Sequence, residues 1–499
     1  MTALLITVRE AEAFERPVRF RLPFHYGSVV LEAAPEIVLR VVVETADGRR
    51  AEGFSAELAA PKWFDKDLAL SHADNFDQLR DATDAAARSA SEVGEAMTPA
   101  RLSVAVAIDH VRHRRRPAGN GLVDAFGVSL VDRAVVDALC RLEGRSLTEM
   151  FHANAVGLDF ALFAPDLAAV DAGRWLAARE PLDRAAIRHT VGFDDPLRSA
   201  DVRPGGRPDD GWPVALSEVI AADGVRRYKI KLSGTVAADI ARLTAVADLL
   251  DRALPAYGAT LDANEQFADA GALAEFYAAV AAEPRLRRLW ASVDYVEQPL
   301  PRHRALAGDV AALSASKPII IDESDDGYGA ALEARRCGYR GVSVKTCKGF
   351  YKSLVNAARA EAWNAEARGA GGNGAGGFLL SAEDLSAQAG HALHQNLALW
   401  SFLGLEDSER NGHHYGPGLS RLPAAERDAF ATVHGDLYAG GRLHITGGSV
   451  ALGTVSAAAG FGTAVPVIVP DSPAMAGTAN DGAGTGAELT GGGGNTQHP

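Results

Sequence analysis

Cysteine and long apolar runs are both scarce in this sequence of 499 residues. The three cysteines, Cys140, Cys337 and Cys347, have no paired or Cys-x-x-Cys spacing, which is typical of reduced thiols in a cytoplasmic protein. No apolar stretch approaches the roughly 20 residues that span a bilayer, and the stretch 1–5 leads at once into charged residues. We therefore expect neither a membrane segment nor a signal peptide.

Basic clusters are nearly absent as well. The formal net charge is −14, and the only dense basic run is the short segment 113–116. This charge balance argues against a surface for nucleic acid or other polyanions. Hydrophobic residues make up 47% and charged residues 23% of the chain, which permits an ordinary packed core. The length allows two or more domains.

The first 150 residues predict an α+β domain. Apolar or β-branched segments at 5–20, 29–31 and 37–44 predict strands, and Asp47-Gly48 indicates a hairpin turn. Farther along, apolar residues recur at helical spacing, and one such helix covers 129–142. A β-meander followed by helices is typical of an α+β domain.

Strand-like and helical segments alternate between residues 185 and 410. This alternation indicates a parallel sheet, and eight predicted strands, the last two at 378–380 and 397–405, indicate a closed barrel. An open doubly wound sheet also alternates, but its ligands sit at a switch point rather than at five successive strand ends. We expect 411–469 to pack back on the first domain. Residues 470–499 have almost no large apolar side chains and are expected to form a disordered tail.

Five successive strands of this barrel end in charged residues. In chain order these are Lys231, Asp262, Glu297, Asp322 and Lys345, with 23 to 35 residues between successive ends. A strand and its return helix take about 30 residues in an eight-stranded (β/α) barrel. The carboxyl ends of barrel strands meet at one mouth, where such enzymes carry out their chemistry. The sequence therefore predicts one site built from these five side chains.

Three of the five side chains are carboxylates. Asp262, Glu297 and Asp322 would repel one another if they were close and unpaired. A hard divalent cation resolves the conflict, and all-oxygen ligation suits Mg²⁺. Zinc is disfavoured because no histidine or cysteine falls at these positions. Helix capping or pairing with arginine explains a single such acid, but explains three in succession less well.

Lysines stand on both sides of the three acids. Lys229 and Lys231 are two residues apart on one strand, so both point into the barrel mouth. A nearby ammonium and desolvation both lower the pKa of a lysine, which would let one of the two accept a proton. Lys345 would face them from the other side. A cation with a base on each side suits removal of the α-proton of a carboxylate substrate, giving a metal-stabilised enediolate.

These motifs resemble the enolase superfamily, and within it the muconate-lactonising-enzyme subgroup of the mandelate racemase/muconate lactonizing enzyme family. The matching elements are Lys229-x-Lys231, Asp262-x-Asn264, Glu297-Gln298-Pro299, Asp322-Glu323 and the strand-final Lys345. The resemblance implies an α/β protein, with a (β/α)7β TIM-like barrel and an α+β capping domain built from the N-terminal region and the C-terminal return.

The resemblance also implies roles for individual residues. It makes Lys231 and Lys345 the acid/base pair, Lys229 the residue that lowers the pKa of Lys231, and the three strand-end carboxylates the ligands of Mg²⁺. Loops of the first domain around His25, Tyr26 and Trp63 would select the substrate. Asn264 is a further candidate for binding it.

Several residues depart from the family pattern. Glu265 adds a charge where the family often has a small or polar residue, and Glu323 competes with Asp322 as a ligand. Glu383, after the seventh predicted strand, replaces a histidine of the mandelate-racemase-like members, and Glu406, after the eighth, could recognise a cationic part of a substrate; both are candidate substrate-binding residues. The run that contains the adjacent His413 and His414 could line the mouth, but adjacent histidines on a loop are more often on the surface, and we expect them there.

Three functions remain open from the sequence. The first is a Mg²⁺-dependent lyase or isomerase (racemase, epimerase, cycloisomerase or dehydratase) that acts on a small carboxylate substrate and assembles as a homo-oligomer. The second is a barrel metallohydrolase, which would want histidine ligands after the first strand, where His189 stands alone. The third is a binding or scaffold protein that retains the fold. The motifs do not specify the substrate.

Overall fold

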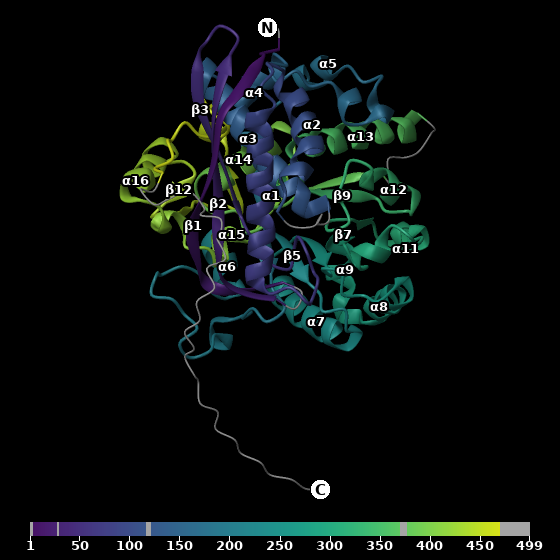
Figure 1. Ribbon diagram of the computed structural model, residues 1–499. Helices are drawn as coiled ribbons and strands as arrows, with labels where there is room; N and C mark the ends of the chain where they lie inside the picture. Colours follow the sequence, from purple (N-terminus) through teal and green to yellow (C-terminus); the bar gives the residue numbers. More distant parts are fainter. Residues whose placement is uncertain (1–2, 27–28, 116–120, 370–376, 470–499) are drawn as a thin grey trace, which may run out of the picture.

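The computed structural model describes residues 3–26, 29–115, 121–369 and 377–469 (Figure 1). The predicted tail, 470–499, lies outside the described residues. Two units are visible: a long three-stranded sheet with helices against it, and a barrel formed by the middle of the chain. No helix among the described residues is long and apolar enough to cross a membrane.

The N-terminal unit is an antiparallel meander backed by helices. Its strands are β1 (Ile6–Tyr26), β2 (Val29–Thr45) and β3 (Arg50–Leu58), and its helices are α1 (His72–Glu92), α2 (Pro99–Asp109) and α3 (Gly121–Glu143). The predicted turn at Asp47-Gly48 joins β2 to β3, with Gly48 at φ +83°. Gly53 lets β3 lie directly on α3, because a Cβ there would be 2.1 Å from the carbonyl oxygen of Ala134. The predicted α+β cap is confirmed.

The central unit is a parallel eight-stranded barrel, as predicted. Its strands are β4 (Arg184–Val191), β5 (Arg227–Lys231), β6 (Gly258–Asp262), β7 (Val293–Glu297), β8 (Ile319–Ile320), β9 (Gly341–Val344), β10 (Leu379–Ala382) and β11 (Asp407–Arg410). Strand β11 pairs with β4, and a parallel bridge between Ile321 and Val342 joins β8 to β9. The strand ends therefore form one mouth.

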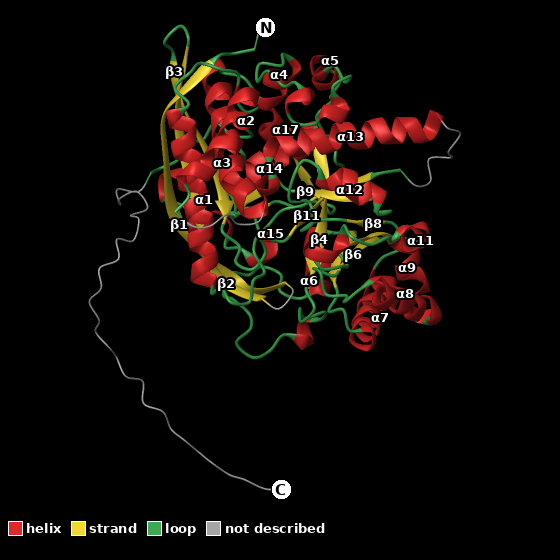
Figure 2. Cartoon of the chain, turned by 45° about the vertical axis from the view of Figure 1, so that its right-hand side comes forward, coloured by secondary structure: helices red, strands yellow, loops and turns green. Residues whose placement is uncertain are grey.

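Helices cover the outside of the barrel between successive strands (Figure 2). They are α6 (Leu216–Asp223), α7 (Val236–Ala253), α8 (Ala270–Ala282), α9 (Arg287–Ser292), α10 (Arg302–Ala305), α11 (Ala311–Ser316), α12 (Ala330–Arg336), α13 (Phe350–Gly369) and α14 (His391–Phe402). Two short helices, α4 (Leu147–His152) and α5 (Ala172–Ala177), lie between cap and barrel in the chain.

The eighth strand is not where the sequence placed it. The segment 397–405, predicted as a strand, contains the end of helix α14, and the strand β11 follows it. All twelve residues of α14 are buried. A helix that is buried on every side has no polar stripe, so its 3.6-residue period is hidden and its apolar run resembles a buried strand.

The C-terminal segment contacts both units. It comprises α15 (Gly412–Tyr415), α16 (Ala424–Val433), β12 (Tyr438–Ala439), β13 (Arg442–Leu443), β14 (Ser449–Ala451) and α17 (Gly453–Ala457). Strand β14 pairs with β4 of the barrel. Two buried ion pairs reach the cap sheet: Arg16 with Glu426 at 2.7 Å and Arg421 with Glu36 at 2.6 Å. In Figure 1, α16 accordingly lies beside β1 and β2.

Candidate active site

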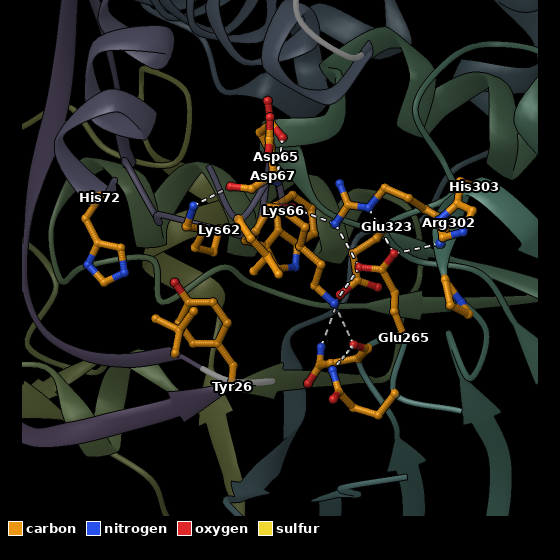
Figure 3. Close-up of a pocket in the computed structure, with 16 residues that line it drawn as sticks. Tyr26, Lys62, Asp65, Lys66, Asp67, His72, Glu265, Arg302, His303 and Glu323 are labelled. Carbon is orange, nitrogen blue, oxygen red and sulfur yellow. Dashed lines mark hydrogen bonds and ion pairs between the residues drawn. The ribbon is translucent and has the colours of Figure 1, made fainter. Parts of the chain in front are cut away.

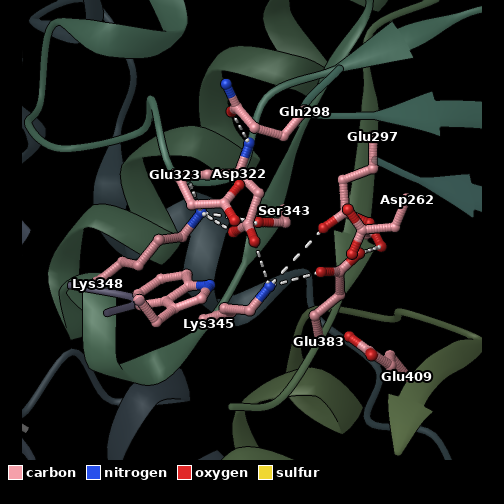
Figure 4. A network of polar contacts seen from close by, with 12 residues as sticks. Asp262, Glu297, Gln298, Asp322, Glu323, Ser343, Lys345, Lys348, Glu383 and Glu409 are labelled. Atoms are coloured by element: carbon pink, nitrogen blue, oxygen red, sulfur yellow. Dashed lines mark hydrogen bonds and ion pairs between the residues drawn. The ribbon is translucent and has the colours of Figure 1, made fainter. Parts of the chain in front are cut away.

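The mouth of the barrel gathers the charged strand ends into one buried cluster (Figure 4). Lys229 and Lys231 both point inward from β5. The residues that alternate with them, Tyr228 and Ile230, are buried in the hydrophobic core. This is the alternation that a strand imposes. Lys229 is 1% exposed and Lys231 is 7% exposed, so both ammonium groups depend on protein partners.

Lys229 is surrounded by four carboxylates. Its Nζ lies 2.8 Å from Glu297, 2.9 Å from both Glu383 and Glu409, and 3.1 Å from Asp262. Burial alone would lower the pKa of Lys229, but these carboxylates raise it well above its usual range. Lys229 is therefore a fixed positive charge at the centre of the mouth.

Lys231 lies at the rim of the same cluster. Its Nζ donates to Asp262 Oδ2 at 2.6 Å and to Asn264 Oδ1 at 2.9 Å. The second oxygen of Asp262 accepts a hydrogen bond from the backbone N–H of Asn264 at 2.9 Å. Asp262 and Asn264 thus hold Lys231 together, which gives a physical reason for the Asp-x-Asn spacing.

A group of three carboxylates has the spacing of a metal site. One oxygen from each of Glu297, Asp322 and Glu383 lies within 4.8 Å of the other two, and all three residues are buried. Lys345 Nζ lies among them, 2.6 Å from Glu383, 2.8 Å from Asp322 and 3.9 Å from Glu297. Burial, and then the neighbouring Asp262 and Glu383, raise the pKa of Glu297 well above its usual range.

This donor set fits a hard divalent cation. Buried carboxylates that lie this close cannot all remain ionised without compensating positive charge, and oxygen-only ligands suit Mg²⁺. The ammonium of Lys345 stands in for such a charge, which shows that the position stabilises a cation. Against burial, Asp322 and Glu383 raise the pKa of Lys345 well above its usual range.

The predicted ligands are only partly brought together. Glu297 and Asp322 belong to the group, whereas Asp262 faces the two lysines of β5. Glu383, which we predicted to contact substrate, takes the third place. The spacing of the motif could not reveal this, because side-chain direction at the mouth depends on which ammonium each carboxylate meets.

Two charged residues of the cluster escaped the sequence reasoning. Lys348 Nζ lies 3.1 Å from Asp322 Oδ1 and 3.3 Å from Asp325, three residues beyond Lys345. Glu409 contacts Lys229 and accepts a hydrogen bond from Thr190 at 2.7 Å. Glu409 was missed because the eighth strand was placed too early.

Glu406 is not part of the site. It is exposed and precedes β11 rather than following it, so it lies at the amino end of the strand, away from the mouth. The prediction that Glu406 follows the eighth strand is wrong for the reason that misplaced the strand. The structure also corrects the surface position expected for His413 and His414: both are buried and their rings pack against His189.

A cavity of about 690 Å³ opens between cap and barrel above the cluster (Figure 3). Its lining includes Tyr26, Trp63, Asn264 and Glu323, so three predicted substrate or loop residues reach it. Burial, and then the charge of Asp322, raise the pKa of Glu323 to about 7. His25 instead lines a separate cavity of about 300 Å³, 3.4 Å from Asp194.

The structure resembles solved structures over most of its length. By sequence the chain matches no protein-family model and no curated protein. Muconate lactonizing enzyme from Pseudomonas fluorescens, solved with muconolactone, has a TM-score of 0.57 at 18% identity and covers 92% of this chain and 97% of its own. A mandelate racemase/muconate lactonizing protein from Herpetosiphon aurantiacus has a TM-score of 0.56 at 18% identity, covering 91% and 98%.

A third neighbour has a different reaction. The dipeptide epimerase from Enterococcus faecalis, solved with Mg and L-Leu-L-Tyr, has a TM-score of 0.54 at 13% identity and covers 82% of this chain and 92% of its own. The fold that the motif resemblance implied is confirmed. The chain therefore has the fold of the mandelate racemase/muconate lactonizing enzyme family.

Proposed function

We propose that the chain is a divalent-cation-dependent lyase or isomerase that removes the α-proton of a small carboxylate substrate. One observation carries the proposal. Lys231 and Lys345 stand at the ends of strands β5 and β9, on two sides of a buried group of carboxylates. The three strands β6, β7 and β8 separate them in the barrel. Such a pair can remove and return a proton on two faces of one carbon atom.

Glu297 and Asp322 would hold the cation, together with Asp262 according to the motif or Glu383 according to the geometry. When bound, the cation would neutralise carboxylates that hold the lysine protons, and would attract the negative charge that develops on the substrate carboxylate. We suggest Mg²⁺ because the donors are all oxygen.

The lysine environments support the remaining roles that we propose. Lys229, with four carboxylate partners, would keep its proton and fix the positions of Glu297 and Glu383. Lys231 and Lys345 have fewer partners and lie nearer the cavity side: Lys231 bonds to Asn264, which lines the cavity, and Lys345 lies 5.5 Å from the ring centroid of Trp63, which also lines it. Their Nζ atoms would move the proton.

The cavity supports a small-molecule substrate. About 690 Å³ lies within the range of ligand pockets, about 300–1,000 Å³. Two of the neighbours were solved with a dipeptide and with muconolactone. Dipeptides, N-acyl amino acids, muconates and sugar acids are therefore the substrate classes to test, and the outcome could be racemisation, epimerisation, cycloisomerisation or dehydration.

Exchange of the substrate α-proton with solvent tests the proposal. Pools of these carboxylates would be incubated with the protein and Mg²⁺ in D₂O and followed by mass spectrometry. We expect deuterium incorporation that Lys231→Ala and Lys345→Ala each reduce by about 10²–10⁴-fold. Glu406→Gln, at the opposite end of the barrel, is the matched control and should exchange as the native protein does.

Other outcomes would favour the alternatives. Hydrolysis without exchange would indicate the barrel metallohydrolase. The structure gives little support to a metallohydrolase. Among the described residues, the group with the spacing of a metal site consists of carboxylates, and His189 packs against other histidines. Cation binding without exchange in any pool would indicate the binding or scaffold protein.

A further inference from the structure

Glu265 is the charge in the motif that the family pattern leaves unexplained. It lies three residues after Asp262, yet its carboxylate does not join the cluster in the mouth. It faces the cap instead, on the wall of the large cavity (Figure 3). The side chain is 4% exposed and is paired with two cations, Arg302 and Lys66.

The contacts of Glu265 join three segments. Arg302, the first residue of α10, donates to Glu265 from its backbone N–H at 2.7 Å and from its guanidinium at 3.0 Å. Lys66, on the cap loop 59–71, lies 2.6 Å from Glu265. The guanidinium of Arg302 also donates to the carbonyl oxygens of Trp63 at 2.8 Å and Phe64 at 3.0 Å. Glu265 and Arg302 therefore fasten the cap loop to the barrel rim.

The backbone at both ends of this contact is in an unusual conformation. Glu265 has φ +70°, Asn264 has φ +42° and, in the cap loop, Lys62 has φ +60°. Residues other than glycine keep such angles only where surrounding contacts hold them, and these positions concentrate at functional sites. The backbone N–H of Glu265 bonds to the carbonyl of Gln298 at 2.8 Å, which turns the carboxylate out of the mouth.

The cap loop places the ring of Trp63 over a lysine of the proposed acid/base pair. The ring of Trp63 is buried, and its centroid is 5.5 Å from Lys345 Nζ. An aromatic face attracts an ammonium at this distance. The loop thus sets one boundary of the space in which Lys345 can move, and the carbonyl of Trp63 is one of the atoms that Arg302 holds.

We infer that Glu265 and Arg302 are positioning residues: with Lys66, they hold the cap loop so that Trp63 covers Lys345. The inference rests on the role proposed for Lys345. It gives the extra acid of the motif a function in docking the cap rather than in binding the cation. It also predicts that the cap loop opens at this latch, since Lys66 is 36% exposed and is the accessible partner.

Packing of aromatic rings is the competing explanation for the position of the loop. Trp63 packs edge-on against Phe64, and Phe64 packs edge-on against Phe126 of the cap helix α3. If these contacts alone hold the loop, removing the charge of Glu265 will not change its mobility. The two explanations therefore differ in what a single substitution does.

Amide hydrogen exchange of residues 59–71 tests the latch without any substrate. We expect Glu265→Gln to raise the exchange rate of protected amides there, such as that of Lys62, which donates to Asn75, by at least about tenfold. The substitution removes the buried carboxylate that Arg302 and Lys66 share. Lys66→Met should give a smaller rise, and it provides the same test if Glu265→Gln does not fold. Glu275→Gln, an exposed glutamate on α8, is the control and should change nothing.

Acylation of lysines, read by mass spectrometry, tests the effect on Lys345. Opening the loop should raise labelling of Lys345 in Glu265→Gln by several-fold while labelling of Lys229, deeper in the mouth, stays constant. Native exchange and native Lys345 labelling in both Glu265→Gln and Lys66→Met would overturn the inference. These readouts do not depend on turnover, so failure of the latch and failure of the proposed reaction can be told apart.

Once a substrate is identified, kinetics give a further check. The same Glu265→Gln variant should lose kcat by about tenfold or more while its affinity for Mg²⁺ stays within twofold, because Glu265 is outside the carboxylate group. Arg302→Lys retains the charge at this contact and should lose less kcat than Glu265→Gln does. A loss of cation affinity equal to the loss of kcat would contradict the positioning role.

Discussion

The barrel mouth and the histidines packed between α14 and the C-terminal segment both bury titratable side chains, but the two groups differ in charge. In the mouth, Lys229 keeps its positive charge within 3.1 Å of four carboxyl groups. Around α14 and α16, the buried His391, His394 and His434 have their pKa values lowered, first by burial, and are neutral near pH 7.

This contrast indicates that the charged groups of the barrel mouth serve a chemical function. A buried ion costs several kcal/mol that pairing only partly repays, so a protein that needs stability alone does better with neutral groups. The three histidines follow that rule, with His394 bonded to the carbonyl of Gly462 at 2.8 Å and to Tyr438 at 3.1 Å. The mouth does not follow it, which is what a cation and proton-transfer site requires.

Removing the central ammonium should have the largest effect on stability. Lys229→Met would leave four buried carboxylates without their shared partner, and we expect a loss of about 3–5 kcal/mol in the free energy of unfolding. Urea denaturation at pH 7 measures it. Lys62→Met, whose ammonium donates to backbone carbonyls in the cap loop, is the control and should cost about 1 kcal/mol or less. Equal losses of unfolding free energy in the two variants would show that the charge of Lys229 in the mouth matters no more to stability than that of Lys62.

Substitution of single carboxylates should show which of them hold the cation. If the geometry is right, Glu383→Gln lowers Mg²⁺ affinity more than Asp262→Asn does, because Glu383 belongs to the converging group. The loss should exceed about tenfold, since even residues that only support ligands are worth about 10–100-fold. Calorimetric titration measures both. The reverse order would favour the ligand set of the motif.

The histidine region should make the protein sensitive to mild acid. Burial, then the charge of Arg141, lowers the pKa of His391 to about 3, whereas in the unfolded chain it is about 6.5. The unfolded state therefore binds more protons between these values, so stability is present above pH 6.5 and is lost as the pH falls, by up to about 1.4 kcal/mol per pH unit.

His391→Gln should flatten this dependence, because glutamine does not titrate. Nearby charges act on the same site: Glu426 lies 4.0 Å away and favours protonation, while Arg16 and Arg421 oppose it. Urea denaturation between pH 5 and 7 provides the measurement, with the exposed His72→Gln as a control. A slope unchanged from the native protein would show that His391 is not held neutral.

Much of the fold could be predicted from the sequence because the barrel repeats a clear pattern. The strands β5, β6 and β7 end at the predicted Lys231, Asp262 and Glu297, and helices lie between them. The pattern failed at β11, where a helix buried on all sides imitates a strand.

Side-chain direction was the part of the site that the sequence could not provide. Glu265 and Asp262 stand in one motif, but a left-handed backbone turns Glu265 toward the cap. Glu383 and Lys348 enter the cluster because they meet particular partners across the barrel, Lys345 and Asp322. These contacts join residues that are far apart in the sequence, so no local spacing specifies them.

Titration with Mn²⁺, read by the paramagnetic signal of the free ion, tests the central claim that the mouth keeps its charge to serve a cation. We predict one ion per chain, competed by Mg²⁺, with binding lost in Asp322→Asn and unchanged in Glu406→Gln. The account would be contradicted if the native protein bound no ion at millimolar concentrations, or if Asp322→Asn bound it as tightly as the native chain.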